Sequence, residues 1–99
     1  MSLGARWASS VHSRFIFAVA SNVEGSTVTG SWVTGIDGEY SSLINNTVYY
    51  NGGAGTIGIF VSYGVAGSNT INQSGSGGVD LDVSNAVSQK NNYCTTGVC

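Results

Sequence analysis

The chain has 99 residues, a net charge of −2 and only 8% charged residues, and its three basic residues are too few to bind nucleic acid. Its 41% hydrophobic and 10% aromatic residues exclude a disordered chain, and no run approaches the ~20 apolar residues that span a bilayer. Fifteen glycines, no proline and abundant Val, Ile, Thr, Tyr and Asn indicate one all-β domain.

Residues 1–20 precede the repeating part of the sequence and have two interpretations. The apolar run from Phe15 to Ala20, which follows Arg14, resembles the end of a secretion signal and indicates an extracellular or cell-surface location. The alternative is a first β-strand. We expect these residues to form an N-terminal cap or a strand, and residues 21–99 to form the repeat.

Short segments centred on asparagine recur at a nearly constant interval. The shared asparagine stands at positions 22, 46, 69 and 92, so that successive intervals differ by no more than one position. An apolar residue follows two positions later at Val48, Ile71 and Cys94, whereas Glu24 breaks the pattern in the first copy. We expect Asn46, Asn69 and Asn92 to form a column of bonded amides, with Asn22 approximately in line.

Two segments show strict alternation of apolar residues with other types. Residues 57–61 read IGIFV, and residues 79–83, about one asparagine interval further along the chain, read VDLDV. Alternation predicts strands with the apolar side chains buried and the others on the outer surface. Gly35-Ile36, which stands one such interval before Gly58-Ile59, indicates an earlier copy.

Each interval therefore holds two or three short strands separated by Gly, Asn and Ser turns, as in one turn of a β-solenoid. The sequence predicts a single domain, 1–99, folded as a right-handed, single-stranded parallel β-helix of about four turns of ~23 residues. The predicted core consists of apolar residues from these strands: Val48, Ile57, Ile59, Val61, Ile71, Val79, Leu81 and Val83.

The segment from Asn45 to Tyr93 resembles the right-handed parallel β-helix repeats of pectate-lyase-like proteins. The resemblance rests on the stretches NNTVYYN, IGIFVS, SNTINQS and VDLDVS and on the closing NNYC. It covers the C-terminal half well and residues 22–44 poorly. Because many activities share these repeats, the resemblance implies a fold more than a function.

Asp80 and Asp82 are the candidate catalytic residues. If the strand 79–83 has its apolar side chains inward, both carboxylates point outward, about 6.5–7 Å apart. Carboxylates of inverting glycosidases stand about 6.5–9.5 Å apart. No catalytic motif accompanies the pair, and a solvated acidic surface is the alternative. If the protein is an enzyme, we expect a polysaccharide lyase or a glycoside hydrolase.

Phe60 and Tyr49 are predicted to point outward by alternation with their neighbours. Together with Asp80 and Asp82, they form the predicted ligand-binding set, because aromatic rings stack on sugars while polar groups bond the hydroxyls. The alternative is that another segment of the chain covers these rings.

Asp37 and Glu39 flank Gly38 in the sequence GIDGEY. Ca²⁺ takes 6–8 oxygen ligands, of which two carboxylates could supply a part. A polar turn is the alternative, and no other cofactor is predicted.

Cys94 and Cys99 lie close together at the end of the sequence. A disulfide between them would close a small loop and pin this end, and two free thiols are the alternative.

Two functions remain open at this point. The first is an extracellular or surface β-helix that binds, or processes, a carbohydrate polymer. The second is a structural or adhesive solenoid, as in a tailspike, adhesin or fibre, which associates with itself or belongs to a longer chain. Open sheet edges at the ends of a solenoid favour the second.

Overall fold

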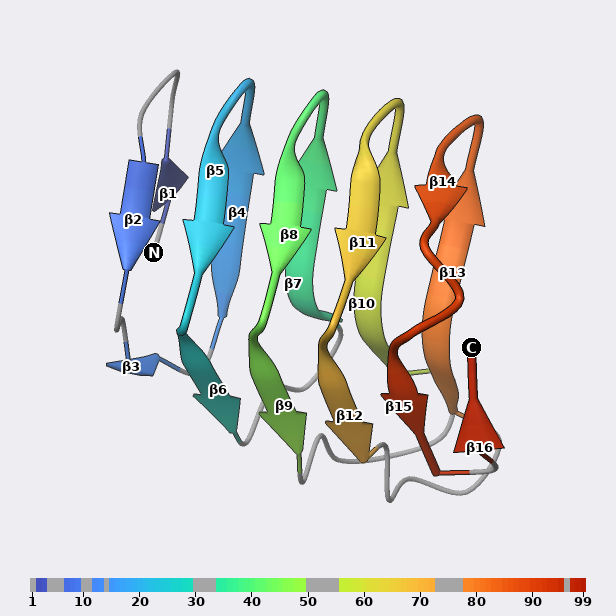
Figure 1. Ribbon diagram of the computed structural model, residues 1–99. Helices are drawn as coiled ribbons and strands as arrows, with labels where there is room; N and C mark the ends of the chain where they lie inside the picture. Colours follow the sequence, from blue (N-terminus) through green and yellow to red (C-terminus); the bar gives the residue numbers. More distant parts are fainter. Residues whose placement is uncertain are drawn as a thin grey trace.

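The computed structural model describes residues 2–3, 7–9, 12–13, 15–29, 34–49, 56–72, 78–95 and 97–99. Side chains are described from Phe15 onward. Every regular element in these ranges is a β-strand, and the strands form three sheets (Figure 1). The all-β prediction is therefore confirmed. None of these ranges contains a helix that could cross a membrane.

The strands fall into three sheets, here called sheets A, B and C. Sheet A contains β1 (Ser2–Leu3), β4 (Ile16–Val19), β7 (Thr34–Glu39), β10 (Ile57–Ser62) and β13 (Val79–Ser84). Sheet B contains β2 (Trp7–Ser9), β5 (Asn22–Glu24), β8 (Ser42–Ile44), β11 (Val65–Gly67) and β14 (Val87–Ser88). Sheet C contains β3 (His12–Ser13), β6 (Thr27–Thr29), β9 (Thr47–Tyr49), β12 (Thr70–Asn72), β15 (Tyr93–Cys94) and β16 (Gly97–Val98).

The chain visits sheets A, B and C in turn and then begins the next circuit, as a solenoid requires (Figure 1). Among the described strands, those of successive circuits pair in parallel, whereas β15 and β16 are antiparallel. These strands make five turns rather than about four. The additional turn comes from β1, β2 and β3, which pair with β4, β5 and β6, so that these strands continue the repeat instead of preceding it.

The turns are not all of equal length, which explains one error in the predicted register. Ile16 pairs with Ile36, and Ile36 pairs with Ile59, so the first of these two turns is shorter than the second. Asn22 consequently lies in sheet B opposite Ser42, away from the asparagine column. Ser26 takes the expected place of Asn22, and its N–H donates to Asn46 Oδ1 at 3.0 Å.

The predicted amide column is present in the remaining turns. Asn46 Nδ2 donates to Val23 O at 3.0 Å and to Asn69 Oδ1 at 3.1 Å. Asn69 Nδ2 repeats this pattern, donating to Leu43 O and to Asn92 Oδ1, both at 2.8 Å. All three asparagines are buried. The amides of Asn46 and Asn69 thus bond the turn before and the turn after them, which satisfies backbone groups that a buried corner would otherwise leave unpaired.

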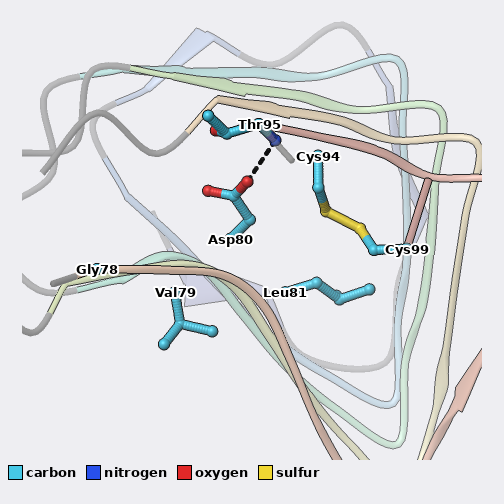
Figure 2. A pocket seen from close by; sticks show the side chains of 7 residues that line it. All are labelled: Gly78, Val79, Asp80, Leu81, Cys94, Thr95 and Cys99. Atoms are coloured by element: carbon cyan, nitrogen blue, oxygen red, sulfur yellow. Dashed lines mark hydrogen bonds between the residues drawn. A yellow bond between two sulfur atoms is a disulfide. The ribbon is translucent and has the colours of Figure 1, made fainter. Parts of the chain in front are cut away.

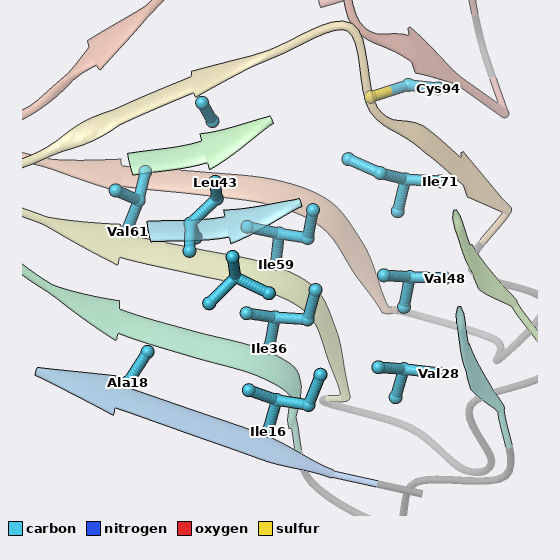
Figure 3. Close-up of a cluster of buried hydrophobic side chains, with 12 residues drawn as sticks. Ile16, Ala18, Val28, Ile36, Leu43, Val48, Ile59, Val61, Ile71 and Cys94 are labelled. Carbon is cyan, nitrogen blue, oxygen red and sulfur yellow. The ribbon is translucent and has the colours of Figure 1, made fainter. Parts of the chain in front are cut away.

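Inward apolar side chains stack in columns between the sheets (Figure 3). One column contains Ile16, Ile36 and Ile59 from sheet A, and another contains residues of sheet C: Val28, Val48, Ile71 and Cys94. Of the predicted core, the residues that are fully or almost fully buried are Val48, Ile59, Val61 and Ile71.

The other predicted core residues are more exposed, for two reasons. Val83 is 37% exposed and Leu81 is partly exposed, because β13 is the last strand in the order of sheet A. Val79 is 45% exposed and Ile57 half-buried because the alternation breaks at the start of these strands, where Gly58 and Ile59 are both buried. Strict alternation therefore predicts the wrong side of the sheet for the first residue of β10 and of β13.

Replacing Asn69 with alanine should lower the free energy of unfolding by about 2–6 kcal/mol. The change leaves Leu43 O and the N–H of Asn46 buried without these partners, at about 1–3 kcal/mol each. Asn72→Ala is the matched control on the exposed side of β12, and its effect should be within about 1 kcal/mol. Urea unfolding measures both, and equal losses would contradict a ladder role for Asn69.

Candidate functional site

The outer face of sheet A carries a column in which aromatic rings and carboxylates alternate. Phe17 on β4 pairs with Asp37 on β7. Phe60 on β10 pairs with Asp37 on one side and with Asp82 on the other. All four side chains are partly exposed. Because neighbouring strands lie about 4.8 Å apart, each carboxylate stands beside a ring.

A second outward column runs beside the first and adds another carboxylate. Glu39 on β7 pairs with Val19 on β4 and with Ser62 on β10. Burial, and then the negative charge of Glu39, raise the pKa of Asp37 above its ordinary value of 3.8. The two residues predicted to hold Ca²⁺ thus lie on one face, but the described residues hold no group of three or more metal-ligating side chains.

A pair of stacked tyrosines borders this face where sheet A turns into sheet B. The rings of Tyr40 and Tyr63 are parallel to within 10°, with centroids 5.1 Å apart. Both side chains are exposed, by 65% and 54%. Their backbones have φ of 51° and 53°, a conformation that costs a bulky residue about 1–3 kcal/mol. The turn therefore holds two large rings outward at a cost in backbone strain.

Three columns thus make a continuous surface, here called the A face. It consists of these outward residues: Phe17, Asp37, Phe60, Asp82, Val19, Glu39, Ser62, Ser84, Tyr40, Tyr63 and Asn85. It unites Phe60 and Asp82 from the predicted ligand-binding set with Asp37 and Glu39 from the predicted metal pair.

Asp80 is not on this face, which corrects the prediction of two outward carboxylates on one strand. Its carboxylate points into the interior of the last turn and accepts a hydrogen bond from the N–H of Thr95 (Figure 2). It lines an end cavity of about 330 Å³ together with Leu81 and the Cys94–Cys99 disulfide. Asp80 and Asp82 therefore lie on opposite sides of β13 and do not share the outward face on which the prediction placed them.

The inward position of Asp80 is explained by the glycine at the equivalent position of the preceding turn. Gly58 stands in line with Asp80, since Ile57 pairs with Val79 and Ile59 with Leu81. A Cβ atom on Gly58 would lie 2.5 Å from the Ile71 side chain and 2.6 Å from the Asp80 carbonyl oxygen. A turn that has another turn stacked on it leaves no room for a side chain at the Gly58 position. The last turn does have room, because Asp80 faces the end cavity.

Tyr49, the remaining member of the predicted ligand-binding set, lies on a different sheet. It belongs to β9 and pairs with Thr29 and Asn72 on the outer side of sheet C. The four predicted ligand-binding residues are therefore divided among the A face, the end cavity and sheet C.

The two cysteines form a disulfide that fastens the end of sheet C. Cys94 is 3% exposed and continues the inward column above Ile71, while Cys99 packs against the core just after β16. The amide of Asn92 donates to Cys99 O at 3.1 Å, so the same segment also closes the asparagine column.

Phe17, Tyr40 and Tyr63 lie outside the predicted ligand-binding set. Tyr40 and Tyr63 stand one asparagine interval apart in the sequence, and each directly follows a strand of sheet A. This recurrence could have identified them. The positive φ at their positions could not be anticipated, because such positions usually carry glycine or asparagine.

Fold and face together define a parallel β-solenoid with an aromatic and acidic outer surface. Comparisons of the chain with protein-family models, with curated proteins and with solved structures find no match. The pectate-lyase-like resemblance therefore stays a proposal based on the repeats.

Asp37→Asn should stabilise the protein at neutral pH. As the pH rises from 3.8 through the raised pKa, the unfolded chain releases this proton before the folded chain does, so stability falls. Asparagine does not ionise, so the Asp37→Asn variant does not lose stability in this way. Its advantage over the unchanged protein in urea unfolding should grow between about pH 3 and about pH 7. An advantage that is independent of pH would contradict the partial burial of the Asp37 carboxyl beside Glu39.

Proposed function

We propose that this chain is a right-handed parallel β-helix of the pectate-lyase-like kind that acts outside the cell or at its surface and binds a carbohydrate polymer on the A face. The observation that carries the proposal is the column of alternating rings and carboxylates, which lies beside the tyrosine stack. Aromatic faces pack against the apolar faces of sugar rings, and carboxylates accept hydrogen bonds from hydroxyl groups. A parallel sheet presents such groups at regular spacing, which suits an extended polymer.

Binding is favoured over catalysis in this proposal. The described residues of the A face include no histidine, and the predicted catalytic pair is divided, because Asp80 is turned into the end cavity while Asp82 stays on the face. The acidic character of the face also argues against nucleic acid as its ligand, because phosphates require basic groups.

Phe60→Ala and Tyr63→Ala should each weaken binding to the glycans that the unchanged protein binds on an array, by about 5- to 150-fold if each ring contributes about 1–3 kcal/mol. Tyr93→Ala is the matched control, because Tyr93 is 66% exposed but lies on sheet C. Thermal unfolding of the three variants checks that they fold.

An array without any bound glycan would contradict the proposal. So would equal losses in Tyr63→Ala and Tyr93→Ala, since these would place the binding surface elsewhere or indicate a general loss of structure.

A second candidate function, self-association, is favoured by the C-terminal end of the solenoid. Val79, Val83 and Val87 are exposed there, and β13 and β14 are the edge strands of their sheets in the described part of the chain. Open edges of this kind pair readily with other strands. In sheet C, β16 pairs with β15 and covers the edge of that strand. Because β16 belongs to sheet C alone, it does not cover the edges of β13 and β14.

Sedimentation should therefore show oligomers at micromolar concentration that Val87→Lys converts to monomers, because a charge on the exposed end opposes stacking. Thr29→Lys, an exposed change on sheet C, is the control and should leave the oligomers intact. A stable monomer before any substitution would overturn the self-association candidate and leave the carbohydrate proposal standing.

A further inference from the structure

We infer that the A face selects a polymer of amino sugars, whose rings stack on the aromatic side chains while their ammonium groups pair with the carboxylates between them. This inference rests on the proposed function and adds the chemical class of the ligand.

The spacing of the first column supports an extended polymer that crosses the strands. Phe17 and Phe60 are separated by one intervening strand, hence by about 9.6 Å, and Asp37 lies between them. Two linked pyranose rings of an extended β-1,4 polymer span a comparable length. A chain lying across the strands can therefore place alternate rings on the two phenylalanines, the sugar between them over Asp37 and the sugar beyond Phe60 over Asp82.

The tyrosine stack extends the same surface along the edge of the sheet. One face of the Tyr40 ring is covered by Tyr63. The position on its other side belongs to Ala20, because Val19, the residue before it, pairs with Glu39. Ala20 is exposed, and its small side chain covers less of that ring face than a second tyrosine would. A sugar ring that continues the stack would lie there, next to the Glu39 carboxylate.

Charge decides which sugar fits the face. Asp37, Glu39 and Asp82 supply three carboxylates, and no described residue of the A face is basic. Lys90, the one basic residue among the side chains described from Phe15 onward, lies between β14 and β15. A polymer of uronic acids would bring further negative charge to these carboxylates, and a neutral polymer would leave them without a counter-charge. An amino-sugar polymer supplies a cation for each of them.

Oligomers of matched length test this selection directly. We expect a β-1,4 glucosamine oligomer to bind about tenfold more tightly than its N-acetylated form at low salt, and an oligogalacturonate to show no binding. The advantage of the amine should shrink in about 1 M salt, where the Debye length falls to about 3 Å, whereas ring stacking should persist.

Charge-neutralising variants locate the effect. Asp82→Asn should reduce affinity for the glucosamine oligomer severalfold and affinity for the N-acetylated oligomer much less, because the amide oxygen still accepts hydrogen bonds from hydroxyl groups but carries no charge. Glu24→Gln, which removes one carboxylate from the exposed side of β5, is the control and should change neither affinity. Thermal unfolding confirms that both variants fold.

The outcomes separate this inference from the proposed function. If the N-acetylated oligomer binds as tightly as the amine, and Phe60→Ala abolishes both, selection by charge is wrong while carbohydrate binding stands. Tight binding of oligogalacturonate, or an equal loss in Glu24→Gln and Asp82→Asn, also overturns the selection. If no glycan binds, on the array or in solution, both proposals fail.

Discussion

The buried asparagine ladder is the interaction on which the other features of this solenoid depend. A corner between two sheets buries backbone groups that no strand can pair, and each unpaired group costs about 1–3 kcal/mol. Asn46, Asn69 and Asn92 satisfy these groups, and their amides also bond each other from turn to turn. The ladder thereby fixes the register in which successive turns stack.

Fixed register converts intervals along the chain into columns on the surface. Because turns are stacked with one residue above another, Asp37, Phe60 and Asp82, which are far apart in the sequence, become neighbours on sheet A. Strand alternation directs them outward and keeps Ile36 and Ile59 in the core. The A face is thus a consequence of the same stacking that builds the core, and its carboxylates and rings inherit the regular spacing of the strands.

The sequence predicted features that recur and failed where the recurrence is broken. The asparagine interval identified the solenoid, and alternation identified β10 and β13, because both patterns reflect direct backbone geometry. Asn22 was misplaced because the turn from Ile16 to Ile36 is shorter than the turns that follow it. The inward position of Asp80 depends on the crowded corner at Gly58, a contact between turns that no single strand reveals.

Side-chain amide signals in nuclear magnetic resonance test the central claim most directly. The Nδ2 protons of Asn46 and Asn69 should exchange slowly with solvent, and each should show contacts to the asparagine of the next turn. The exposed Asn72 supplies the reference for fast exchange. Exchange of Asn46 and Asn69 at the rate of Asn72, without contacts between the amides, would contradict the ladder and the stacking that builds the A face.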